Sequence, residues 1–231
     1  MQLRLLTTDD ERREFADRLV HARAGKGLGF SETGHSALGE IHLGYGEVRA
    51  LYDETGSAPN EMLAGFVLHS LATFPQSYPR PDLTHLPAED VYECGELWAL
   101  APGAARLARH AGFILAGLRK AQAILVYPIF KPRNLTPFYK TFSRAGVPIE
   151  WPYAKTLEGG EVWVQPMVLE GLALEMTVNV ATALSLESFD GRTLQFRNPF
   201  PIVPKLGRRI PLHAPSVPEV RGGRRVLQLR R

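Results

Sequence analysis

The stretch VYECGELWALAPGAARLARHAGFILAGLRKAQAILVY, residues 91–127, decides the fold that the sequence predicts. Its first ten residues are rich in strand formers and stop at Pro102-Gly103, a strong turn signal. From Ala104 onward, apolar residues recur at helical spacing. The closing run, 121–127, is apolar but too short for a helix. The stretch therefore predicts a strand, a tight turn, a helix and a second strand.

A strand that enters a helix through a glycine turn is suited to bind an anion. Backbone N–H groups and the helix dipole both point at whatever lies there. Arg106 and Arg109 share one face of the first helical turns and add positive charge. We therefore expect a phosphate or pyrophosphate at this turn, although an ordinary connection without a ligand has the same pattern.

The composition is that of a globular protein. The chain has 231 residues, of which 45% are hydrophobic and 22% charged, which suits one large domain or one domain with an appended piece. No apolar run reaches the roughly 18 residues that span a bilayer, and the first residues lack a signal-peptide pattern. Cys94 is the only cysteine, so neither an intrachain disulfide nor a thiolate metal cluster is expected. We expect a cytoplasmic protein without a metal.

Charge is distributed unevenly along the chain. Residues 191–231 contain ten Lys and Arg side chains and a single acidic one, Glu219, so residues 1–190 are net acidic although the whole chain carries +3. From Asn198 on, proline and arginine dominate. This segment is predicted to be an extended basic arm, and nucleic acid is a candidate partner for it.

The remaining pattern predicts the other elements. Strands are expected at 2–6, 47–52, 61–71, 147–153 and 161–169, with helices at 10–24 and 136–145. Residues 25–46, which include His35, His42 and Tyr45, are expected to form a long loop, and 172–189 favours strand over helix. The fold class is therefore α/β (α+β): a mixed, mostly antiparallel twisted sheet flanked by helices, with residues 1–170 as the domain and 171–231 as a C-terminal extension.

This element order, with an anion-binding turn after the fourth strand, resembles the GNAT (Gcn5-related N-acetyltransferase) superfamily over residues 2–169. The run Arg106-Leu-Ala-Arg109-His-Ala111 is similar to the family's pyrophosphate signature, Gln/Arg-x-x-Gly-x-Gly/Ala, with Arg109 in place of the first glycine. Asn134 and Gly146-Val147 resemble the second signature, whose usual tyrosine position is Phe142 here. The final strands look like those of N-acyl amino acid and autoinducer synthases.

The resemblance implies a site for acyl-CoA. The residues that it assigns to cofactor binding are Trp98, Leu100, Gly103, Ala104, Ala105, Arg106, Arg109 and Asn134. It also implies that a backbone N–H near Trp98–Leu100 binds the thioester carbonyl and that Tyr139, three residues before Phe142, protonates the leaving thiolate.

A carboxylate beside that donor is the expected base. Strand alternation places Glu96 on the same face as Cys94 and Trp98, and a carboxylate on an apolar strand face can accept a proton. Glu93, predicted to face the other way, is the second candidate for the base.

Two functions follow. The first is an acyl-CoA-dependent N-acyltransferase acting on an amine acceptor, with acyl carrier protein as another candidate donor and a homodimer as a candidate assembly. The alternative is a non-catalytic GNAT-like module that binds nucleic acid or a protein partner through residues 191–231.

Overall fold

The computed structural model describes residues 1–37, 44, 46–54, 61–73, 80–101, 103–139 and 142–197. His42, Tyr45, Pro102 and the basic arm from Asn198 onward therefore lie outside the described residues.

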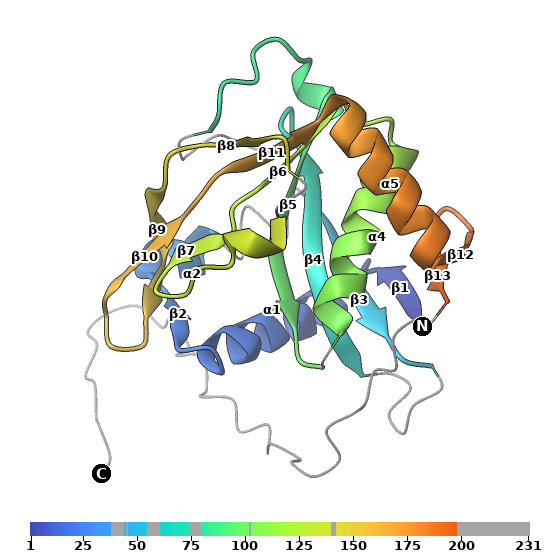
Figure 1. The fold of residues 1–231 in the computed structure, drawn as a ribbon. Helices are drawn as coiled ribbons and strands as arrows, with labels where there is room; N and C mark the ends of the chain where they lie inside the picture. The colour runs from blue at the N-terminus through green and yellow to red at the C-terminus, as the bar shows by residue number, and fades with distance from the viewer. Residues whose placement is uncertain are drawn as a thin grey trace.

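A nine-stranded sheet forms the centre of the molecule (Figure 1), in the order β12-β13-β1-β3-β4-β5-β6-β11-β8. Its strands are β1 (Gln2–Leu5), β3 (Glu47–Tyr52), β4 (Met62–Ser70), β5 (Val91–Ala99), β6 (Ala123–Val126), β8 (Arg144–Ala145), β11 (Met167–Glu170), β12 (Leu186–Phe189) and β13 (Thr193–Phe196). Among the described strands of this sheet, only β5 and β6 pair in parallel, and the other registered pairs are antiparallel. The predicted mixed, mostly antiparallel sheet is thus confirmed.

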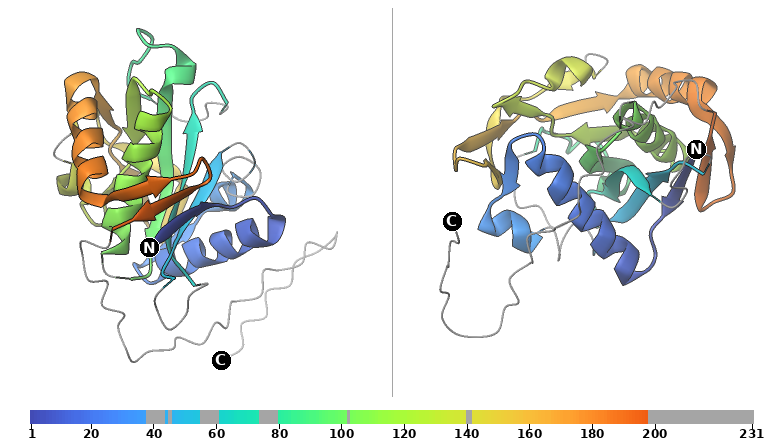
Figure 2. Two further views of the ribbon diagram at one scale, coloured as in Figure 1. Left: turned by 90° about the vertical axis from the view of Figure 1, so that its right-hand side faces the viewer. Right: turned by 90° about the horizontal axis from the view of Figure 1, so that it is seen from below.

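Helices cover both faces of this sheet (Figure 2). α4 (Ala104–Leu118) and α5 (Gly171–Ser185) lie side by side on one face, where they bury a large apolar cluster. α1 (Asp9–Ala24) covers part of the other face through Phe15 and Leu19. Next to α1, a second sheet has the order β2-β9-β10-β7, with β2 (Leu28–Phe30), β7 (Ile129–Lys131), β9 (Ile149–Thr156) and β10 (Glu161–Val164).

The start of α1 shows how local chemistry fixes an element. Thr8 accepts a hydrogen bond from the backbone N–H of Glu11, and the Glu11 carboxylate accepts one from the N–H of Thr8 at 3.0 Å. This capping box satisfies two N–H groups that the first helical turn leaves without partners. The helix begins at Asp9, within one residue of its predicted start.

Two segments contain more elements than the sequence predicted: one was predicted as a loop and the other as a single strand. Residues 25–46 contain β2 and the short helix α2 (Glu32–Ala37). The strand predicted at 161–169 is broken at Gln165-Pro166, and its halves β10 and β11 belong to different sheets. Proline lacks the N–H that a central strand needs, which explains the break.

The helix predicted at 136–145 is wrong. The chain forms a 3₁₀ turn, η3 (Thr136–Tyr139), and then the strand β8. Ala145 pairs with Met167 of β11, so pairing along the sheet edge replaces continued helix.

The strand favoured at 172–189 is also wrong up to Ser185, because this segment is α5. Leu174, Val178 and Ala181 recur at helical spacing and pack against α4. A Cβ added at Gly117 of α4 would lie 2.4 Å from Val178, so the two helices approach closely. Packing therefore overrides the β-branched composition of this stretch.

Residues 186–196, predicted to belong to an extension, continue the main sheet. β13 pairs with β1, Leu3 lying opposite Leu194. The turn between β12 and β13 is held by Asp190, whose carboxylate accepts hydrogen bonds from the N–H groups of Arg192 at 2.9 Å and Thr193 at 2.6 Å.

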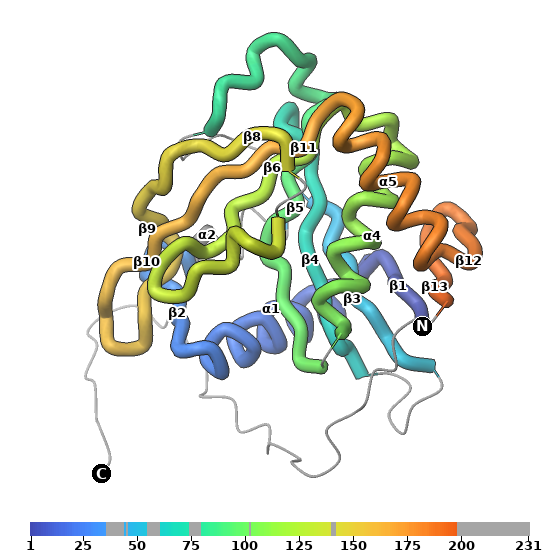
Figure 3. Tube along the Cα trace, viewed as in Figure 1, coloured from blue at the N-terminus to red at the C-terminus, as the bar shows by residue number. Residues whose placement is uncertain are grey.

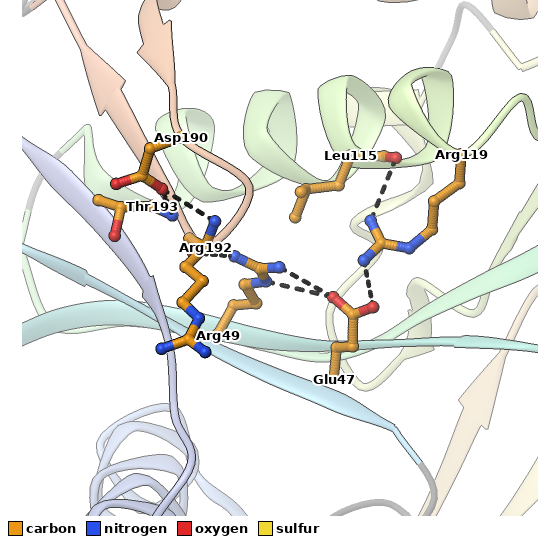
Figure 4. Close-up of polar contacts among 7 residues, drawn as sticks. All are labelled: Glu47, Arg49, Leu115, Arg119, Asp190, Arg192 and Thr193. Carbon is orange, nitrogen blue, oxygen red and sulfur yellow. Dashed lines mark hydrogen bonds and ion pairs between the residues drawn. The ribbon is translucent and has the colours of Figure 1, made fainter.

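A charge network around the buried Arg49 connects this hairpin to β3 and α4 (Figure 4). Arg49, 1% exposed, donates to the carboxylate of Glu47 at 3.0 Å and to the carbonyl of Arg192 at 2.5 Å. Arg119, after the end of α4, donates to the other oxygen of Glu47. Desolvation lowers the pKa of Arg49, and the Glu47 carboxylate opposes that shift.

Candidate active site

A β-bulge interrupts the ladder between β4 and β5. Gly65 lies opposite Trp98 and Val67 opposite Gly95, so Glu96 and Leu97 together face the single residue between them on β4. Glu96 has φ 51°, in the left-handed region that a non-glycine residue rarely adopts. A bulge turns backbone groups out of the ladder and reverses the facing of the residues beyond it.

The bulge changes which face the β5 side chains occupy. Cys94, before it, faces α4: a Cβ added at Gly112 would lie 3.1 Å from its Sγ. Trp98, after it, packs edge-on against Phe15 of α1 with ring centroids 5.5 Å apart. The expectation that Cys94, Glu96 and Trp98 share one face is therefore wrong, because simple alternation does not hold across the extra residue.

Glu96 lies on the α1 face and forms an ion pair with Arg23 from the last turn of α1. The Arg23 guanidinium also lies 4.2 Å from the ring centroid of Phe30 on β2. The Glu96 side chain is 7% exposed and that of Arg23 is 20% exposed. A carboxylate and a guanidinium thus lie together beside the bulge.

β5 and β6 separate just before the bulge. Val91, Tyr92 and Glu93 are registered with β6, and no described residue beyond Glu93 is. Beyond this register the two strands run apart (Figure 3). The edge of β5 that carries the bulge therefore has no ladder partner on the β6 side within the described part of the chain.

The turn after β5 has part of the predicted anion-binding geometry. Gly103 has φ 81° and precedes α4, whose N-terminus has no side-chain cap. The N–H groups of Ala104 and Arg106 already bond to carbonyls within the turn, at 3.2 Å and 3.1 Å. The side chain of Arg106 is exposed beside the first turn, and Ala105 is exposed too.

Arg109 is directed away from the turn. It donates to the carbonyl of Phe138 at 2.9 Å and lies 5.6 Å from the ring centroid of Tyr139. Burial lowers its pKa. Of the two predicted guanidinium groups, only that of Arg106 lies exposed at the turn.

Of the segment predicted to bind the thioester carbonyl, Leu100 already uses its N–H within the sheet. Trp98 is 1% exposed in the α1-face core, and the N–H of Leu100 donates to the carbonyl of Leu63 at 2.9 Å. The backbone at Glu96 and Leu97 is the part of β5 that leaves the ladder.

Tyr139 lies on the α4 face with Cys94. Desolvation raises the pKa of Tyr139 to about 12, with a further contribution from Cys94, and Arg109 opposes the shift. The phenol therefore holds its proton at neutral pH.

Asn134 caps η3. Its side-chain oxygen accepts hydrogen bonds from the backbone N–H of Thr136 at 3.0 Å and from the Thr136 hydroxyl at 2.6 Å.

Arg23 and Phe30 were missed as site residues. Arg23 is one of several arginines in a helix with no local signal that separates it from the others, and its partner is 73 positions away. A second buried pair on the same face, His69 and Glu93, is described below.

The described residues show neither a metal-binding cluster nor a membrane-spanning helix. No cluster of three or more His, Cys, Asp or Glu side chains suited to a metal ion occurs there. None of the described helices has the length and apolarity to cross a bilayer.

A cavity of about 600 Å³ lies away from the bulge, between the C-terminal end of α4 and the start of α5. Its lining includes His85, Gly117, Glu170, Leu174 and Val178. It contains none of the predicted site residues. We place the candidate active site at the bulge because the chemistry-bearing groups gather there.

Comparison of the sequence with protein-family models and with curated proteins finds no match. Comparison with solved structures finds similar folds. The N-acyl amino acid synthase FeeM from uncultured soil microbes is 10% identical with a TM-score of 0.52, the alignment covering 79% of this chain and 98% of that one. A ribosomal-protein-alanine N-acetyltransferase from Brucella melitensis is 10% identical with a TM-score of 0.46, covering 73% and 99%. On the first of these likenesses and on its own sheet order, the chain has the fold of the GNAT superfamily.

Proposed function

We propose that this protein is an N-acyltransferase that moves an acyl group from an acyl-CoA to an amine. The observation that carries the proposal is the bulge at Glu96–Leu97, beside the separation of β5 and β6, with the Arg23–Glu96 pair on its α1 face. An unpaired strand edge can bind a thioester through its backbone, and the adjacent carboxylate can receive the proton of an amine.

Each step of the transfer has a candidate residue. Glu96 accepts a proton from the acceptor's ammonium group, and the neutral nitrogen attacks the thioester carbon. A backbone N–H at the bulge stabilises the negative charge on the carbonyl oxygen. The C–S bond then breaks, and the thiolate takes a proton from Tyr139, whose pKa of about 12 keeps it protonated until then.

The donor's pyrophosphate is proposed to bind at the turn before α4. Gly103 brings the backbone close, the uncapped helix N-terminus supplies positive potential, and Arg106 adds a charge. Because Arg109 bonds to Phe138, we assign it to holding η3 and Tyr139 in place rather than to direct phosphate contact. An acyl carrier protein is a second donor to be tried in the same assay.

The acceptor is proposed to be an amine that also carries a carboxylate. One line of support is that FeeM, which has a similar fold, is named an N-acyl amino acid synthase. The other is Arg23: a guanidinium has five N–H donors, so it can bind a second carboxylate together with Glu96.

Ligand-induced stabilisation tests donor binding. An acyl-CoA at 100 times its Kd should stabilise the fold by about 2.7 kcal/mol, which is measurable as a higher Tm. Arg106→Glu should lose most of this shift while remaining folded, whereas Arg13→Glu, which changes an exposed arginine of α1, should keep it. Equal shifts in both variants would remove the phosphate assignment.

A further inference from the structure

A buried carboxylate–imidazole pair lies on the same face of β5 as Glu96. His69 and Glu93 are register partners on β4 and β5, and the His69 Nε2 is 3.8 Å from a carboxylate oxygen of Glu93. His69 is 3% exposed and Glu93 is 2% exposed. Burying two ionisable groups is costly, and the chemistry proposed above uses neither of them.

The pair lies where β5 and β6 separate. Glu93 is the last residue of β5 registered with β6. Strand alternation predicted Glu93 and Glu96 on opposite faces of β5, but the bulge brings both side chains to the α1 face. Three residues of a regular strand span about 10 Å, and the bulge shortens that distance between the Cα atoms of Glu93 and Glu96.

Gly95 leaves the space between the two carboxylates open. A Cβ added at Gly95 would lie 3.6 Å from an oxygen of Glu93, so the Glu93 carboxylate leans along the strand toward the bulge. Ordered water that bonds to both groups can connect two carboxylates that do not touch.

Other groups surround this pair. Tyr127 follows β6, and burial raises its pKa, with Glu93 adding to the shift and Arg80 opposing it. Cys94 lies on the opposite face of β5, and its pKa is raised to about 12, so it is a neutral thiol. Arg80 is a permanent cation beside Tyr127, where it opposes the effect of Glu93.

Proton balance supplies the reason for a second acceptor. A protonated amine must lose two protons to become an amide nitrogen: one before attack and one from the tetrahedral addition compound. One proton ends on the departing sulfur through Tyr139, and Glu96 accepts only one at a time. A proton on Glu96 also disturbs the charge balance of its pair with Arg23, so Glu96 is restored when that proton moves on.

We propose that the His69–Glu93 pair is the second proton acceptor of the transfer, reached from Glu96 through water in the space beside Gly95. This assignment rests on the proposed function. In one turnover the first proton passes from the ammonium to Glu96 and then to the pair, and the second passes from the tetrahedral nitrogen to Glu96. Tyr139 gives its proton to the thiolate. Afterwards the pair and Glu96 each release one proton to solvent and Tyr139 takes one back, so that one proton is released per turnover.

The pH dependence of kcat/KM distinguishes two acceptors from one. Thiol release from acyl-CoA is measured with a panel of amino acids and simple amines. If both acceptors must be unprotonated, kcat/KM of the wild type falls about 100-fold per pH unit on the acid side, and that of Glu93→Gln falls about tenfold per unit. Glu93→Gln should also lower kcat by about 100-fold with an unchanged KM for acyl-CoA.

Two further variants separate this role from a structural one. Gly95→Val alters no titratable group but fills the space between the carboxylates, and it should lower kcat while keeping the acyl-CoA Tm shift. Glu89→Gln, an exposed carboxylate just before β5, should behave as wild type.

An acid slope of about tenfold per pH unit in the wild type would overturn the assignment. So would a Glu93→Gln variant with an unchanged profile and kcat within about twofold of wild type. If the wild type releases no thiol with any amine, the proposed function fails and this assignment fails with it.

Discussion

Arg23, in the last turn of α1, and Glu96, in the bulge of β5, form an ion pair that joins two segments 73 positions apart. Phe30 of β2 lies against the same guanidinium. The pair thus connects α1, the small sheet and the bulged strand at one point, which is the point where we propose the acceptor binds.

Removing Arg23 should damage both stability and activity. Arg23→Gln leaves the Glu96 carboxylate, 7% exposed, without its cation, at a cost of about 2 kcal/mol in the free energy of unfolding. The rate of acyl transfer by Arg23→Gln should also fall. Arg13→Gln, at an exposed position of the same helix, is the control and should change neither quantity. Urea unfolding and thiol release measure the two effects, and an active, stable Arg23→Gln protein would contradict the account.

The network around Arg49 should matter for stability alone. Glu47→Gln removes the carboxylate shared by Arg49 and Arg119, and Arg49 is almost fully buried. We expect a loss of about 3 kcal/mol in the free energy of unfolding, because a buried charge then lacks its partner. The acyl-CoA Tm shift should persist. Glu54→Gln, which breaks an exposed pair with Arg4, should cost less than about 1 kcal/mol.

Truncation should separate the basic arm from the body. A chain ending at Arg197 retains β13 and its pairing with β1, so it should keep the Tm of the full chain. A chain ending at Glu170 loses α5 and the last two strands and exposes the apolar face of α4 that packs against Leu174 and Val178. We expect the shorter chain to aggregate or to unfold at a lower temperature in calorimetry. Equal transitions would show that residues 1–170 form an independent domain.

Stability should fall on acidification through His110. Desolvation lowers the pKa of His110 to about 4, helped by Arg109 and Arg106, and its Nδ1 lies 2.8 Å from the Ser185 hydroxyl. The unfolded chain binds this proton below about pH 6.5 and the folded chain only near pH 4. The free energy of unfolding therefore declines between these two pH values. His110→Gln should flatten this decline; an unchanged pH dependence in the variant would contradict the assignment.

The central prediction, for residues 91–127, followed from local sequence patterns. The strand, turn, helix and strand of residues 91–127 appear as β5, the Gly103 turn, α4 and β6, because each is encoded by nearby residues. The mixed, mostly antiparallel sheet and the resemblance to GNAT proteins followed from the element order around this stretch. α5 was missed because its β-branched residues favour strand locally, while its packing on α4 depends on residues far away in sequence.

The site was harder to predict than the fold. A bulge adds one residue without any compositional signal, yet it moves Glu96 to the α1 face and makes Glu93 its neighbour there. The ion pair with Arg23 depends on tertiary contacts that no local pattern encodes. The roles assigned to Glu96, Tyr139 and the Gly103 turn stay predictions.

The most direct test is the reaction itself. Purified protein is incubated with acyl-CoA and amino acids, and thiol release and the mass of an N-acyl product are followed together for the wild type and for Glu96→Gln. The account predicts equal amounts of thiol and product from the wild type and a rate about 100-fold lower from Glu96→Gln, which still binds acyl-CoA. No product from the wild type, or equal rates from the two proteins, would contradict it.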